Sequence, residues 1–143
     1  MELHFPAMRC AGHLATYADA AFSKEQEKGY GMRGAVHLRR GEELGSKKSV
    51  HHLLQAECKS LKLVTRSSFS AETMGATGAL DTQWPLLLTL HEMQRGNVTA
   101  AQAKQIRENG GLAVKASLTI DAMSVFSAVA AQPLKPPAEK NLA

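Results

Sequence analysis

The chain has 143 residues, which is enough for one domain with a single core and too few for two. Lys and Arg outnumber Asp and Glu by 17 to 13, and the net charge of +4 is compatible with a polyanionic partner without requiring one. The sequence has no apolar run of membrane-spanning length and no signal-peptide core at its start. We therefore expect an intracellular protein, cytoplasmic or nuclear, that is not secreted and has no membrane partner.

The first half of the chain has three segments with strand character. Residues 14–22 and 50–57 are the first and third of these segments. Between them, in residues 29–39, two sets of side chains alternate along the chain, so the two sets are expected to point to opposite faces of a sheet. One face carries Met32, Gly34, Val36 and Leu38, and the other carries Arg33, His37 and Arg39. The stretch 41–48 is predicted to be a loop.

A long helix is predicted to follow, from residue 70 to about residue 95, because the sequence becomes rich in Ala, Met and Leu. Pro85 lies inside this stretch. Proline lacks an amide hydrogen and its ring clashes with the preceding turn, so we expect the helix to kink or restart there. Gly75 and Gly78 should weaken the helix further, by roughly 1 kcal/mol each relative to Ala.

The last part of the chain is predicted to form a short helix, a strand and another helix. Thr99 and Gln102 fit a capping box and a glycine pair follows residue 109, which predicts a helix over 99–109. In residues 112–120 apolar side chains alternate with small or polar ones, as in a half-buried strand. A helix over 122–132 should then stop at a proline, and residues 133–137 read as a rigid linker.

Three carboxylates lie at junctions between these elements. Asp19 is near the end of the first strand, Glu72 is at the start of the main helix and Asp121 follows the fourth strand. Hydrolysis of a phosphodiester by two metal ions needs carboxylates that converge from different elements to hold both ions. Oxygen ligands of this kind suit Mg²⁺. The three positions therefore suggest a metal-dependent phosphodiesterase.

Each carboxylate also has a purely structural interpretation. Asp19 fits a turn after a strand, and Asp121 fits the N-cap of the helix that starts at residue 122, a role worth roughly 1 kcal/mol. Glu72 in a first helical turn is favoured by the helix dipole without any metal. Only the ordered set of three indicates a shared site. Asp81 is expected on the main helix, away from that site.

Four short motifs occur in a fixed order along the chain. They are Tyr-Ala-Asp-Ala-Ala-Phe at 17–22, Lys-Gly-Tyr at 28–30, Ser-Ser-Phe-Ser-Ala-Glu at 67–72 and Asp-Ala-Met-Ser at 121–124. In this order they resemble the motifs of the ribonuclease H domain at the end of copia-type retrotransposon polyproteins. The resemblance spans about residues 14 to 142, nearly the whole chain.

The resemblance implies an α/β fold of the ribonuclease H type, with a mixed central sheet flanked by helices and the element order βββα(α)βα. The domain would cover residues 14–132, between a lead-in at 1–13 and a proline-rich tail at 133–143. Asp19, Glu72 and Asp121 would be the catalytic residues and the ligands of two Mg²⁺ ions, with Mn²⁺ as a possible substitute. The implied activity is endonucleolytic cleavage of the RNA strand of RNA–DNA hybrids, next to a reverse transcriptase domain upstream in a polyprotein.

The sequence also departs from this family. The last helix of the family and its fourth carboxylate would come after residue 142, and Glu139 is the only acidic residue after Asp121. Ala21 and Phe22 replace the usual Asp-Trp, and Ser70 replaces the first Glu of Glu-Ala-Glu. These departures favour an alternative, a truncated and catalytically inactive retroelement remnant that at most binds nucleic acid.

Basic residues near the second strand and before the main helix are candidates for contact with a nucleic-acid backbone. They are Arg39, Arg40, Lys59, Lys62 and Arg66. A solvated charged rim explains them equally well. Adjacent His51 and His52 should point to opposite faces of a strand, so they are not expected to share a metal ion. The two cysteines, at 10 and 58, fit no metal or CxxC pattern and are expected to be reduced thiols.

Overall fold

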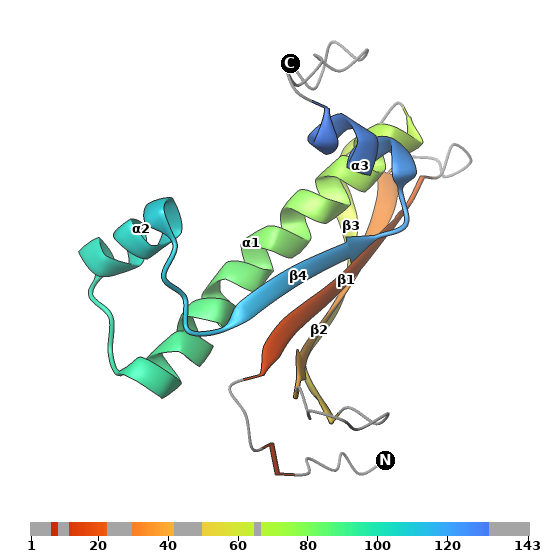
Figure 1. Cartoon of the computed structure of the whole chain (residues 1–143). Coiled ribbons are helices and arrows are strands. Elements are labelled where there is room, and N and C mark those ends of the chain that lie inside the picture. Colours follow the sequence, from red (N-terminus) through yellow and green to blue (C-terminus); the bar gives the residue numbers. More distant parts are fainter. Residues whose placement is uncertain (1–6, 9–11, 23–29, 42–49, 65–66, 132–143) are drawn as a thin grey trace.

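The computed structural model describes residues 7–8, 12–22, 30–41, 50–64 and 67–131 (Figure 1). Along the chain these residues form three strands, two helices, a fourth strand and a third helix. The elements are β1 (His13–Ala21), β2 (Tyr30–Arg40), β3 (His51–Val64), α1 (Ser68–Arg95), α2 (Ala100–Asn109), β4 (Lys115–Ile120) and α3 (Met123–Ala130). The expected α/β class and element order are confirmed. The third strand extends beyond the predicted residue 57, and the fourth begins three residues later than predicted.

The four strands form one mixed sheet in the order β3-β2-β1-β4. β1 pairs with β2, and β2 with β3, in antiparallel fashion, whereas β1 and β4 are parallel. The parallel pair requires a crossover, which α1 and α2 supply. Because β4 returns beside β1, the first and fourth strands end at the same edge of the sheet (Figure 1).

The described helices leave one face of the sheet uncovered. α1 packs across β1, β2 and β4, and α3 lies against α1 (Figure 1). The expectation of helices flanking the sheet is therefore met on one face only within the described residues. On the other face, Tyr17, Val36 and Leu53 are more than a third exposed.

The alternation predicted for β2 is confirmed, but the polar face is the one that α1 covers. His37 is completely buried. Thr16 Oγ1 lies 2.9 Å from Nδ1 of His37 and accepts a hydrogen bond of 2.9 Å from Nε2 of Gln83 on α1. Gln83 Nε2 also donates to the carbonyl oxygen of Ser117 on β4, at 2.9 Å. This buried network joins α1 to three strands and satisfies Nδ1 of His37, whereas Nε2 of His37 is buried without a partner among the described residues.

α1 runs as one helix through Pro85, so the predicted restart of the helix at this residue is wrong. Its N-terminus is capped by Ser67, whose hydroxyl accepts from the backbone N–H of Ser70 at 3.1 Å. Pro85 is exposed, whereas Leu87 and Leu90 beyond it are buried in a core cluster that includes residues of β1 and the segment before β4. Tertiary packing on both sides of the proline thus holds the helix together.

The two glycines of α1 allow close contact with the sheet. A Cβ on Gly75 would lie 3.0 Å from the Cβ of Ala20, and a Cβ on Gly78 would overlap the guanidinium of Arg33. Residues that weaken the helix intrinsically therefore permit its close packing on β1 and β2.

Candidate metal centre

The three carboxylates singled out by the sequence lie together. The parallel register of β1 and β4 ends with Ala18 opposite Ile120, so the next residues, Asp19 and Asp121, follow side by side. Glu72 reaches them from α1. One ligand oxygen from each carboxylate lies within 4.8 Å of the other two. The expected convergence is thereby confirmed.

The structural interpretations of the individual carboxylates fail. Asp19 lies within β1 and not in a turn. The N-cap of α3 is Ala122, which has no side-chain cap bond, so Asp121 is not the N-cap. α1 begins at Ser68 and has no acidic residue in its first turn, which places Glu72 beyond the reach of the helix-dipole effect. Local stability therefore does not explain why these three residues are acidic.

The electrostatics of the group are those of crowded negative charges. Burial raises the pKa of Glu72, and the neighbouring carboxylates of Asp121 and Asp19 raise it further. A hydrogen bond from the backbone N–H of Ala20 opposes this shift. Asp19 and Asp121 are exposed, and Glu72 is half-buried. A cation placed among the three would relieve their repulsion.

The arrangement can bind a metal ion through oxygen ligands. Carboxylates are hard ligands, suited to cations such as Mg²⁺, Ca²⁺ or Mn²⁺. The three carboxylates come from β1, α1 and the end of β4, and all three belong to residues that the sequence had indicated.

Two of the basic residues expected to meet nucleic acid, Arg39 and Arg40, lie at the far end of the sheet from this centre. Arg39 and Arg40 pair with Leu14 and His13. Asp19 is six residues beyond His13 on β1, so Arg40 lies about 20 Å from Asp19 along the sheet.

Lys59 is nearer the acidic end of the sheet, because it is opposite Arg33, which is in turn opposite Ala20. Its Nζ lies 2.5 Å from a carboxylate oxygen of Glu57, so part of its charge is neutralised within the protein. The side chain of Lys62 and the whole of Arg66 lie outside the described residues.

Sequence reasoning missed the position of Arg33. It belongs to the face of β2 that α1 covers, where its guanidinium lies against Gly78. A hydrogen bond from Lys59, and then the charges of Lys59 and Arg33, hold the pKa of Glu57 below its usual value against the effect of burial. The spacing of Gly75 and Gly78 on one helix face was the available signal that a large side chain passes beneath.

Comparison with protein-family models, curated proteins and solved structures finds no match for this chain. Within the described residues, no helix combines the length and apolar character needed to cross a membrane. What the protein does must therefore be inferred from its own residues. The most informative are the three converging carboxylates.

Proposed function

We propose that this chain is a ribonuclease H-like domain of a copia-type retroelement that cleaves the RNA strand of RNA–DNA hybrids with the help of divalent cations. The observation that carries this proposal is the convergence of Asp19, Glu72 and Asp121 within 4.8 Å. The four sequence motifs, in the order of that family, and the mixed sheet with parallel β1 and β4 add support.

The residues fit a divalent cation. Three negative oxygen ligands converge. The pKa of Glu72 is raised first by burial and then by repulsion from Asp121 and Asp19, and a cation would remove that repulsion. Asp19, Glu72 and Asp121 would hold two Mg²⁺ ions, for which Mn²⁺ could substitute. Bound ions of this kind stabilise negative charge on the oxygens of the scissile phosphate and lower the pKa of a bound water molecule.

The protein's own contribution is to fix the positions of the ligands. Asp19 and Asp121 are placed by the hydrogen-bonded parallel strands, and Glu72 is held by the N–H of Ala20. This arrangement avoids reorganisation when a substrate binds. Asp19 and Asp121 are exposed, as a site that receives a phosphate within a long polymer requires.

A second candidate function follows from the number of carboxylates. The metal-binding group within the described residues has three members, whereas the proposed family uses a fourth. Glu139, the only further acidic residue after Asp121, lies outside the described part of the chain. A remnant that binds nucleic acid without cleaving it is therefore the alternative.

The deciding experiment is cleavage of an end-labelled RNA–DNA hybrid by the purified chain with Mg²⁺, with Mn²⁺ and with a chelator. Asp19→Asn removes one proposed ligand. Asp81→Asn is its matched control, because Asp81 is an exposed residue of α1, nine residues and about 14 Å along the helix from Glu72. Both variants change the charge equally.

Cation-dependent cleavage that persists in Asp81→Asn and is lost in Asp19→Asn would support the proposal. Equal cleavage by Asp19→Asn and the unmodified chain would contradict the assignment of the site. Salt-sensitive binding of the hybrid, without cleavage under any condition, would instead favour the binding remnant.

A further inference from the structure

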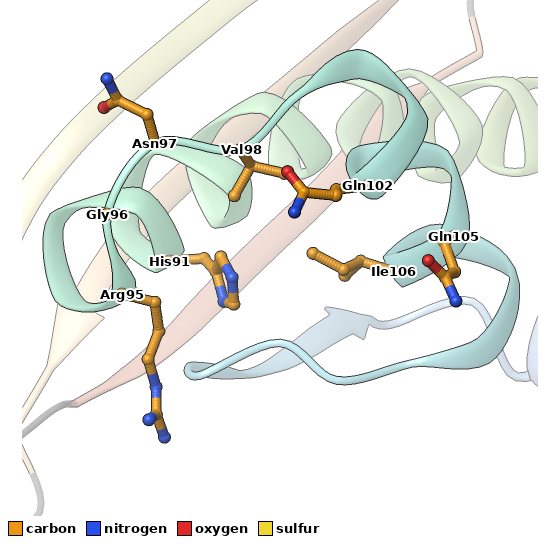
Figure 2. A pocket seen from close by; sticks show the side chains of 8 residues that line it. All are labelled: His91, Arg95, Gly96, Asn97, Val98, Gln102, Gln105 and Ile106. Carbon is orange, nitrogen blue, oxygen red and sulfur yellow. The ribbon is translucent and has the colours of Figure 1, made fainter.

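A pocket of about 300 Å³ lies between the C-terminal part of α1 and α2, away from the carboxylates (Figure 2). α2 is held beside α1 by Arg107, whose guanidinium lies 5.5 Å from the centre of the Trp84 ring. His91, which lines the pocket, is 19 residues beyond Glu72 on α1, about 28 Å along the helix. The pocket is therefore separate from the candidate metal centre.

The central polar group of the pocket is the imidazole of His91. The residue is only 8% exposed, and its Nδ1 accepts a hydrogen bond of 3.0 Å from the backbone N–H of Ala113. An Nδ1 that accepts must be unprotonated, so the proton of the neutral ring is on Nε2. The protein supplies no partner for this N–H within the described residues. His91 therefore offers a fixed donor to a ligand.

The rest of the lining suits an anion that also has an apolar part. Figure 2 shows the side chain of Ile106 pointing toward His91, with Val98 beside them. Gln102 uses its Oε1 to accept from Thr99, which leaves its amide nitrogen directed into the pocket.

Charge in the lining has one sign. None of the eight lining residues is acidic, and Arg95 supplies a cation at the rim. The nearby carboxylate of Glu92, which is not part of the lining, accepts a hydrogen bond of 3.0 Å from the backbone N–H of Val98. Its guanidinium points away from His91 in Figure 2, but exposed side chains change rotamer within nanoseconds. A ligand with an anionic oxygen can therefore meet both the His91 donor and the Arg95 charge.

We infer that this pocket binds a small organic anion, a carboxylate or a phosphate monoester, whose oxygen accepts from Nε2–H of His91 and whose apolar part packs on Val98 and Ile106. The size of the pocket is at the lower end of ligand sites, so the expected ligands are ring-sized. This function is independent of the proposed nuclease activity.

The test is a titration of the full chain with phenyl phosphate, benzoate and neutral benzamide, followed through the ¹⁵N and ¹H resonances of the His91 ring. Phenyl phosphate and benzoate distinguish the two anion types, and benzamide keeps the ring without the charge. We expect a saturable shift of Nε2–H of His91 with at least one anion, at a dissociation constant of roughly 1 mM. Benzamide should bind at least about three-fold more weakly.

Three variants make the test specific without removing His91, whose loss would leave the N–H of Ala113 unpaired. Ile106→Trp fills the pocket and should abolish the saturable shift. Arg95→Gln should weaken anion binding about three-fold, whereas Lys104→Gln, which removes the same charge from an exposed site on α2, should not. Binding unaffected by Ile106→Trp, equal effects of the two charge variants, or no saturable shift with either anion would overturn the inference.

Discussion

Gly75 of α1 packs directly on Ala20 of β1: a Cβ added to the glycine would lie 3.0 Å from the Cβ of the alanine. Glu72 is one helical turn before Gly75, and its carboxylate accepts from the N–H of the same Ala20. The distance between helix and strand at this point therefore sets the distance between Glu72 and its partner Asp19.

Replacing Gly75 by Ala is expected to destabilise the protein by about 1–2 kcal/mol, although Ala is the better helix former, because helix and strand must move apart. The same movement should weaken binding of Mg²⁺. Chemical denaturation and a Mg²⁺ titration of Gly75→Ala measure the two effects. The control is Gly78→Ala in an Arg33→Ala background, where the overlapping guanidinium is gone and the better helix propensity should stabilise by roughly 1 kcal/mol. Stabilisation by Gly75→Ala itself would show that the contact is not tight.

Glu72→Gln is expected to stabilise the protein at neutral pH without divalent cations. The pKa of Glu72 is raised in the folded state, so the ionised carboxylate opposes folding, and stability of the unmodified chain should increase as pH falls through that raised pKa toward 4.5. Mg²⁺ at about ten times its dissociation constant should stabilise the unmodified chain by about 1.4 kcal/mol and the variant much less. Thermal unfolding with and without Mg²⁺ measures both. An equal response of the two proteins to Mg²⁺ would place the cation elsewhere.

Acid should destabilise the protein through His37. Burial lowers its pKa from 6.5, and the nearby charge of Glu57 only partly opposes this. Below pH 6.5 the imidazole of His37 binds a proton in the unfolded chain but not in the folded chain. The contribution of His37 to the free energy of unfolding is therefore complete above pH 6.5 and is lost as pH falls toward the lowered pKa. Urea denaturation between about pH 5 and 8 measures the slope. His37→Gln, which cannot titrate, should have a smaller slope, and identical slopes would assign the effect to other groups.

Pro85→Ala should stabilise α1. The proline is exposed and leaves the carbonyl of Asp81 without its helical donor, so restoring the N–H is expected to raise the free energy of unfolding by up to about 3 kcal/mol. Met93→Ala, at a residue 73% exposed on the same helix, is the control and should change little. If Pro85→Ala were neutral in denaturation experiments, the helix would already accommodate the proline without strain.

The element order and the three carboxylates were accessible from the sequence because both depend on local signals. Alternation identified the strands, the Thr99–Gln102 capping box located α2, and the motifs around Asp19 and Asp121 marked the ends of two neighbouring strands. These signals require no knowledge of which surfaces meet in the folded chain.

The covered face of β2 was not accessible in this way. Alternation shows that His37 and Val36 lie on opposite faces of β2, but a comparison of the hydrophobicity of the two faces favours burial of the face with the valine. The buried residue is His37, because Thr16 and Gln83 form the network around it. Such a pairing between residues far apart in sequence has no local signature, and neither does the tertiary packing that keeps α1 intact at Pro85.

The parallel pairing of β1 with β4 also determines when the centre assembles during folding. His13 and Ser117, which are hydrogen-bonded across this pair, are 104 positions apart in the chain. Contacts of such long range are slow to form because a large loop must close first, whereas the antiparallel strands and α1 are local. The three carboxylates thus come together only when β4 pairs with β1. A luminescent lanthanide that binds all three carboxylates would report the closing step of folding.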